Sequence, residues 1–309
     1  MSIERTLTLG WNYGLLGVER FGGRLGPVLF ILPDGRQVAP LSIAPWFGEE
    51  IDLSRQPLFH RLRGEWPCVP FGFDRDRPAT QDWPSGSVGS CVDVGHGYGS
   101  SHEWELLEHS TTRVSLAIAY PAGHPIARLE RTICPVPDRP AIDLHLSVEV
   151  RSDCRLPIGL HPTLAAPKAD GRWFIDLDPR TIVATYPYQP DPLSIITPGL
   201  FVPIGAVPGT DGSIIDARYF PPKRRAEDLL QVLEANGSVG LLNSSENYRL
   251  GLSWVRDHFP SLLLWISNRA LTAPLGIRAS RLWVSSPYAP RSISAVGCPR
   301  RTIRLAGVA

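Results

Sequence analysis

Two histidines have surroundings that suit proton transfer. His161 lies in RLPIGLHPTLAAP (155–167), after an apolar run and directly before a proline. His96 lies in DVGHGYGSSHEWELLEH (93–109), where glycines and serines predict a flexible, exposed loop. Because a free imidazole titrates near about pH 6.5, such a pair could exchange protons with a ligand near neutral pH. The alternative is that both are ordinary polar residues at strand ends.

Other chemistries lack their motifs. The chain has no GxSxG nucleophile elbow, no phosphate-binding Walker loop and no GxGxxG. GHGYG (95–99) is not a dinucleotide-binding GxGxxG motif, because no helix is predicted after it. Four possible zinc ligands lie close together in the sequence: His96, His102, Glu103 and His109. Their spacing fits no zinc motif. We therefore expect neither a metal nor a cofactor.

The elements that must carry these histidines are predicted to be strands. In residues 141–150, AIDLHLSVEV, apolar and polar side chains alternate with period two, which is typical of a strand with one buried face. Similar strands are expected over 112–120, 128–134, 172–177, 181–186, 248–255, 261–267 and 280–286. With 31 prolines and 28 glycines to form turns, the chain is predicted to be all-β, an antiparallel β-sandwich.

One segment favours a helix instead. Residues 226–237, AEDLLQVLEANG, place Leu229, Leu230 and Leu233 on a helical stripe, with acidic residues in the first turn and Asn-Gly at the end. We find no repeat, low-complexity tract or linker, so residues 1–309 are expected to form a single domain.

Composition limits the partners and the compartment. A net charge of +1 gives no reason to expect nucleic acid or an anionic membrane. No apolar window is long enough for a membrane span, and the N-terminus lacks the apolar region of a signal peptide. Five widely spaced cysteines without a CxxC predict reduced, mostly buried thiols. We expect a cytoplasmic protein, monomeric or homodimeric.

The order of several motifs resembles the aldose 1-epimerases, or galactose mutarotases. LRGEWPCVPFGFDR (62–75) is similar to the family's early stretch that leads to a sugar-binding arginine, and HGYGSSHEWEL (96–106) to its first histidine segment. RLPIGLHPTLA (155–165) is similar to its second histidine motif, and GTDGSIIDARYF (209–220) to its aspartate loop. SLLLWIS (261–267) is similar to a late strand with a tryptophan. The resemblance spans roughly residues 11–305, and the His-Pro motif is its most specific part.

The resemblance implies a large antiparallel β-sandwich that binds a small carbohydrate and interconverts its anomers. It implies that His161 is the acid that protonates the ring oxygen and that His96 shares this role. It also implies sugar-binding roles, which fall on Arg75, Asp216, Trp265 and Ser286. Trp46, Trp66, Trp104 and Trp265 are candidates for stacking on a sugar face, but most of them are expected to lie in the core.

The sequence departs from the family at the residue that should act as base. The family has a glutamate before a proline near the C-terminus, whereas this chain has Ser286 before Pro287. A serine hydroxyl is no base near neutral pH without help. Ser100 stands where the family has an arginine, and Thr163 and Leu164 replace the aromatic after His-Pro.

Carboxylates elsewhere offer no obvious replacement for the missing base. Those considered are expected to be solvated charges, namely Glu65, Asp74, Glu103, Glu105 and Glu246. Two alternatives to an epimerase therefore stay open. One is a carbohydrate-binding protein without activity, and the other is a different acid–base reaction in a biosynthetic pathway.

Overall fold

The protein is described here by a computed structural model. It describes residues 6–44, 58, 62–72, 95–165, 167, 172–189 and 191–268, and the backbone of 281–293 and 300–308; of residue 155, too, only the backbone is described.

The larger of two extended sheets has nine antiparallel strands. Their spatial order is β17-β12-β19-β20-β23-β9-β8-β7-β6. The strands span, in that order, Tyr219–Phe220, Trp173–Asp176, Ser238–Asn243, Tyr248–Trp254, Arg300–Val308, Ala141–Val150, Ile126–Pro135, Val114–Ala119 and Glu105–His109. The last strand of the chain, β23, thus lies in the middle of this sheet, between β20 and β9.

The second large sheet carries the site described below. Its order is β14-β13-β18-β21-β22-β10-β5, and β11 pairs with β22 beside this path. These strands span Phe201–Pro203, Ile182–Thr185, Ala226–Val232, Ser261–Asn268, Arg281–Ile293, Cys154–Leu160, Pro67–Cys68 and, for β11, Thr163–Ala165.

Shorter elements complete the described part of the chain. A four-stranded sheet contains β1 (Thr6–Trp11), β2 (Gly14–Glu19), β3 (Arg24–Ile31) and β4 (Gln37–Val38). A small hairpin contains β15 (Val207–Pro208) and β16 (Ile214–Ile215). Two short 3-10 helices, η2 (Tyr98–Ser101) and η3 (Ile204–Ala206), lie in loops.

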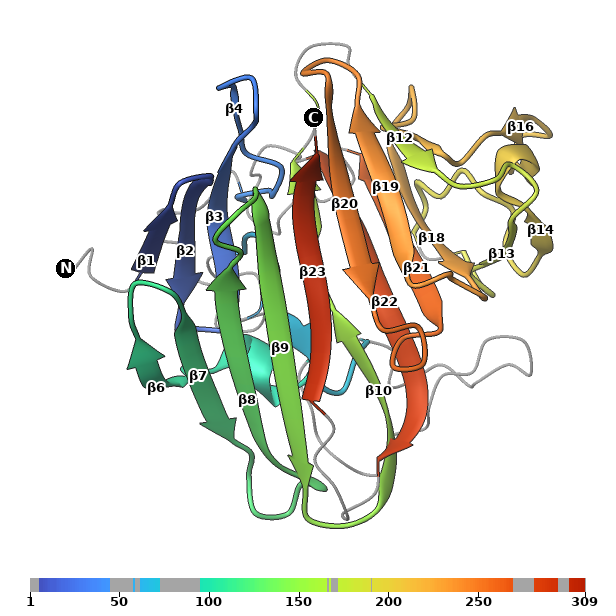
Figure 1. The fold of residues 1–309 in the computed structure, drawn as a ribbon. Helices are drawn as coiled ribbons and strands as arrows, with labels where there is room; N and C mark the ends of the chain where they lie inside the picture. Colours follow the sequence, from blue (N-terminus) through green and yellow to red (C-terminus); the bar gives the residue numbers. More distant parts are fainter. Residues whose placement is uncertain are drawn as a thin grey trace.

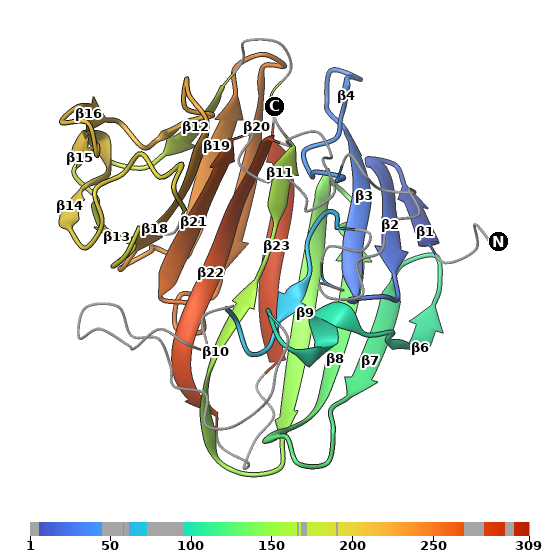
Figure 2. The ribbon, with the colours of Figure 1, turned by 180° about the vertical axis from the view of Figure 1, so that it is seen from behind.

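The two large sheets pack face to face, with β9, β20 and β23 in one layer and β10, β21 and β22 in the other (Figures 1 and 2). Alternate side chains of both layers fill the space between them. They include Leu144 and Leu146 of β9, Leu250 of β20, and Leu262 and Leu264 of β21, all buried. This arrangement confirms the predicted all-β sandwich.

The strand predictions agree with the observed elements, but the helix prediction for 226–237 is wrong. Residues 226–232 form β18, which pairs with β13 on one side and β21 on the other. Ala226, Asp228, Leu230 and Val232 are buried in alternation, while Glu227 and Leu229 are half-buried. The apolar residues of this segment fit the period of a helix as well as that of a strand. Pairing with two neighbouring strands favours the strand.

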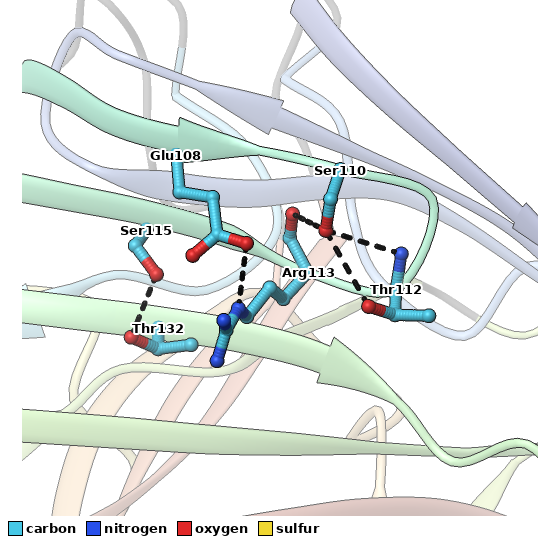
Figure 3. A network of polar contacts seen from close by, with 6 residues as sticks. All are labelled: Glu108, Ser110, Thr112, Arg113, Ser115 and Thr132. Atoms are coloured by element: carbon cyan, nitrogen blue, oxygen red, sulfur yellow. Dashed lines mark hydrogen bonds and ion pairs between the residues drawn. The ribbon is translucent and has the colours of Figure 1, made fainter.

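The outer face of β6, β7 and β8 is polar. Figure 3 shows Arg113 paired with Glu108 on an exposed surface, and the hydroxyls of Ser115 and Thr132 facing each other across β7 and β8. Exposed pairs of this kind contribute little to stability because water screens the charges. This face holds a hairpin together and lies on the other side of its sheet from the core.

Two further expectations can be compared with the described residues. Cys68, Cys134 and Cys154 are free, with Cys68 buried and the other two partly buried. Cys91 and Cys298 lie outside the described residues. Among the elements described, none is a helix with the length and apolar character needed to cross a membrane.

Candidate functional site

His161 lies where β10 ends and β11 has not yet begun, and both of these strands pair with β22. Its backbone N–H donates to the Trp66 carbonyl at 2.9 Å. Its ring stacks on the Trp66 indole, with ring centroids 4.1 Å apart and planes inclined by 17°. The Thr163 hydroxyl lies 3.4 Å from Nδ1. The imidazole is thereby held in one orientation and is only 4% exposed.

His96 lies just before η2 and its ring centroid is 4.9 Å from that of His161. The structure therefore brings together the two histidines that the sequence singled out. Against expectation, His96 is buried, at 8% exposure. Its backbone has φ 60°, and it is held by paired contacts with Gly72. The His96 N–H donates to the Gly72 carbonyl at 2.9 Å, and the Gly72 N–H donates to His96 Nδ1 at 3.4 Å.

This arrangement sets the tautomer of His96. Because Nδ1 accepts a hydrogen bond, the proton of the neutral ring sits on Nε2. Burial lowers the pKa of His96 to about 3. Burial, and secondarily the proximity of His96, lowers the pKa of His161 well below its usual value. Both imidazoles are therefore neutral near neutral pH in the unliganded site.

Aromatic rings surround the histidine pair. The Phe71 ring centroid is 5.0 Å from His96 and 6.3 Å from His161. Trp265 on β21 meets His161 edge-on at 6.2 Å. Phe71 and Trp265 are partly exposed, whereas Trp66 is buried. Flat aromatic faces beside polar groups suit a ligand that has both apolar C–H surfaces and hydroxyls.

A layer of buried charge lies behind Trp66. The Arg24 guanidinium is 5.8 Å from the Trp66 ring, and its Nη2 donates to the Leu58 carbonyl. Arg131 pairs with Glu65, both 1% exposed. Burial raises the pKa of Glu65, and Arg131 opposes that rise. This layer anchors the segment that carries Trp66.

Glu227 is a carboxylate at the site that the sequence did not single out. It lies on β18 opposite Ser267 of β21, and its neighbour on the same face, Leu229, lies opposite Trp265. The Trp265 Nε1–H donates to Glu227 Oε1. Burial raises the pKa of Glu227 to about 7. The Trp265 N–H and the nearby Ser267 hydroxyl partly offset the rise, although Ser267 Oγ has no hydrogen bond of normal geometry among the described residues.

Had residues 226–237 been predicted as a strand, Glu227 would have been a candidate site residue. As a helix, the segment places Glu227 in an acidic first turn, where a solvated charge is ordinary. As a strand, it places Glu227 on the face opposite to buried Ala226 and Asp228. The same face of the neighbouring strand carries Trp265.

Of the other predicted sugar-binding residues, Asp216 lies away from the histidines, whereas the backbone of Ser286 lies beside His161. Asp216 follows β16 and pairs with Arg218, which holds the pKa of the carboxyl below its usual value. The β15–β16 hairpin lies at the lateral edge of the molecule, away from η2 and β10 (Figure 2). The backbone of Ser286 lies opposite Leu263 of β21. On the other side of β22, the pairs Gly159–Tyr288 and Thr163–Val284 place Ser286 level with His161. Arg75 lies outside the described residues.

The carboxylates considered as a replacement base lie elsewhere. Glu65 was expected to be a solvated charge, and this prediction is wrong. It is buried and pairs with Arg131, and the pair anchors the segment of Trp66. Glu103 pairs with Arg20 at the surface, Glu105 approaches Arg128, and Glu246 accepts from the Asn243 side chain. Asp74 lies outside the described residues.

Two further expectations concern metal binding and tryptophan. Among the described residues, no group of three or more His, Cys, Asp or Glu is placed to hold a metal ion. Trp66 and Trp104 are buried as predicted, and Trp46 lies outside the described residues.

Sequence comparisons find no relative: no family model matches the chain, and no curated protein does. Solved structures do match. A candidate aldose 1-epimerase of Escherichia coli K12 superposes with a TM-score of 0.64 at 16% identity, over 98% of both chains. A galactose mutarotase-like protein of Lactobacillus casei gives 0.62 at 13%, over 98% of this chain and 99% of that one.

An aldose epimerase homologue of C. elegans gives a TM-score of 0.62 at 12% identity, over 98% of both chains. Identities this low speak for the fold and not for the activity. The resemblance inferred from the motifs is thus confirmed at the level of architecture. The chain is a divergent protein with the fold of the aldose 1-epimerases and galactose mutarotases.

Proposed function

We propose that the protein binds an aldose or a sugar derivative and interconverts its anomers, with His161 exchanging the proton of the ring oxygen. The observation that carries the proposal is the pair of imidazoles, His161 and His96, with centroids 4.9 Å apart and bordered by Phe71 and Trp265. The fold shared with aldose 1-epimerase-like proteins agrees with it.

The chemistry requires a proton donor and a proton acceptor at the two oxygens of the anomeric carbon. Ring opening protonates the ring oxygen and removes the proton of O1, so that O1 becomes a carbonyl oxygen. Reclosure on the other face reverses both transfers. Each group therefore acts once as acid and once as base in a turnover. His161 is held rigidly enough for this by Trp66 and Thr163.

His96 is proposed to share the contact with the ring oxygen. Its neutral tautomer presents Nε2–H as a donor, because Nδ1 is occupied by the Gly72 N–H. A neutral imidazole can polarise an oxygen through such a bond without carrying a charge itself. The proposed ligand is a small carbohydrate, and the proposed setting is the cytoplasm.

The first test is anomer exchange, followed by NMR across a panel of free and phosphorylated aldoses. The wild type is expected to accelerate exchange for at least one sugar, and His161→Ala to lose at least about 100-fold of that rate. His109→Ala is the matched control. His109 is the last residue of β6, is exposed, and contacts only the Thr8 carbonyl of β1 among the side-chain hydrogen bonds described for it. Equal rates for wild type and His161→Ala would refute the role of His161.

A second candidate function is carbohydrate binding without turnover. The observation that favours it is Ser286 in place of the family's glutamate. In that case sugars bind to the wild type without any acceleration of exchange. His161→Ala would then weaken binding, and Ser286→Glu would introduce activity. Calorimetry alongside the NMR assay separates the two functions.

A further inference from the structure

We propose that Glu227 is the second proton-transfer residue of this site and faces O1 of an aldose whose ring oxygen faces His161. This inference rests on the proposed function and names the group that the sequence left unidentified. The carboxylate of Glu227 on β18 would exchange the O1 proton. Ser286 on β22, at the position of the family's glutamate, has no carboxylate to do so.

The positions of Glu227 and His161 relative to Trp265 are the first argument. The indole edge meets the His161 ring at 6.2 Å, and the indole Nε1–H is bonded to Glu227 Oε1. The two groups therefore border the same aromatic side chain. The strands β21 and β22 separate β18 from β10, and the pairings Glu227–Ser267, Ser267–Leu282 and Leu282–Ala165 place Glu227 four residues from His161 along the strands, with Trp265 between the two levels.

The second argument concerns the other oxygen of the Glu227 carboxylate. Oε1 accepts from Trp265, whereas Oε2 is buried and has no hydrogen bond of normal geometry among the described residues, although the Ser267 hydroxyl nearby lowers the pKa of the carboxyl. A buried polar atom without a partner costs about 1–3 kcal/mol and usually has a functional reason. A sugar hydroxyl that donates to Oε2 would satisfy it, and the O1–H of an aldose is such a donor.

The charges around Glu227 support a proton-exchanging role. Asp191 and Asp228 raise its pKa further, and the Trp265 N–H and the Ser267 hydroxyl lower it. Asp228 is committed elsewhere, because its carboxylate accepts from the Ser194 hydroxyl and from the backbone N–H groups of Ile195 and Ile196. Among the described residues, the groups with the largest effects on the pKa of Glu227 include no cation. A carboxylate without a fixed cationic partner can gain and lose a proton at little cost.

The proposed step balances without a co-reactant. Protonated His161 gives its proton to the ring oxygen, the bond from C1 to that oxygen breaks, and the electron pair of the O1–H bond forms the carbonyl. The ionised Glu227 takes the O1 proton. After rotation about C1–C2, Glu227 returns its proton to O1, the ring oxygen attacks C1, and His161 recovers its proton. One proton is shared by the pair throughout.

That shared proton predicts the pH profile. In the unliganded site it resides on Glu227, because His161 is neutral and Glu227 has a raised pKa. The pair loses the proton as pH rises through about 7. We therefore expect kcat/KM for anomer exchange to fall above about pH 7. The profile is the same whichever residue carries the proton in the reactive complex.

The test compares Glu227→Gln, Glu227→Asp and the wild type, using the panel sugar that the wild type accelerates most. Glu227→Gln keeps the size of the side chain and cannot exchange a proton, so kcat is expected to fall at least about 100-fold with KM little changed. Glu227→Asp keeps a carboxylate and should retain part of the rate. Glu234→Gln is the control, since Glu234 is an exposed glutamate just after the same strand.

Each result separates this inference from the proposed function. Loss of rate in both His161→Ala and Glu227→Gln, with both variants folded by circular dichroism, supports both. Normal turnover in Glu227→Gln but not in His161→Ala overturns the role of Glu227 alone. A raised KM at unchanged kcat in Glu227→Gln also overturns it, because Glu227 would then only hold a hydroxyl. A wild type that accelerates no sugar overturns both.

Discussion

At the residue scale, the site reverses the usual ionisation of its side chains. Histidines that titrate near neutrality in water are buried and kept neutral, while a glutamate is shifted up to the working pH range. The common cause is burial, which disfavours whichever form carries the charge. Groups whose environments change their pKa values in opposite directions are typical of sites that transfer protons.

This shift makes the stability of the protein depend on Glu227. The folded pKa of about 7 lies above the usual glutamate pKa of 4.5, so the folded state binds a proton that the unfolded state has already released. The resulting stabilisation is complete below about pH 4.5 and is lost as pH rises through about 7. We expect Glu227→Gln to remove this dependence, which amounts to up to about 3 kcal/mol.

Urea unfolding at pH 5 and pH 8.5 measures this effect. The wild type should lose more stability between the two pH values than Glu227→Gln does, and Glu234→Gln should behave like the wild type. An equal loss in Glu227→Gln and the wild type would show that Glu227 ionises normally in the folded protein.

At the element scale, His96 depends on the loop that precedes η2. Gly97 has φ 82°, and a Cβ at this position would stand 2.1 Å from the Val69 carbonyl oxygen. The Gly97 carbonyl also accepts from the Ser100 hydroxyl at 2.8 Å. The loop therefore closes against the segment of Val69 only if residue 97 lacks a side chain.

We expect Gly97→Ala to destabilise the protein by at least about 2 kcal/mol, since it combines a left-handed backbone with a clash against backbone. It should also displace His96 and slow anomer exchange. Gly123→Ala is the control, because Gly123 is exposed and a Cβ there meets nothing within 4 Å. Thermal unfolding measured on both variants decides the matter, and a Gly97→Ala protein as stable as Gly123→Ala would contradict the steric argument.

At the scale of the whole molecule, the last strand joins the two halves of the nine-stranded sheet. β23 pairs with β20 over Arg249–Trp254 and with β9 over Ala141–Ser147. Without it, the facing edges of β9 and β20 would lose their hydrogen-bond partners inside the sandwich. The sheet is thus completed only when the end of the chain has been added.

Deletion of residues 300–309 is therefore expected to abolish cooperative unfolding, as followed by circular dichroism during a urea titration. Deletion of residues 308–309 is the matched control, because it removes a single pairing, that of Val308 with Arg249. A chain that lacks 300–309 and still unfolds cooperatively with wild-type stability would show that β23 contributes little to the fold.

The fold was largely predictable because it depends on local pattern. Period-two alternation in residues 141–150 identifies β9 with its bounds, and similar apolar runs identify β7, β8, β12, β13, β20, β21 and β22. It failed at β18, where Leu229, Leu230 and Leu233 satisfy a helical period as well. The local preference for helix or strand is weak in this segment. Pairing with β13 and β21 stabilises the strand.

The β-sandwich, its likeness to the mutarotase architecture and the pair His161 and His96 could all be predicted from residue patterns. Each of these is recorded in residue types along a short stretch of chain. The burial and neutrality of both imidazoles, and the position of Glu227 beside Trp265, depend instead on contacts between distant strands. The pKa of a group depends on its neighbours in space, and those neighbours come from strands far apart in the sequence.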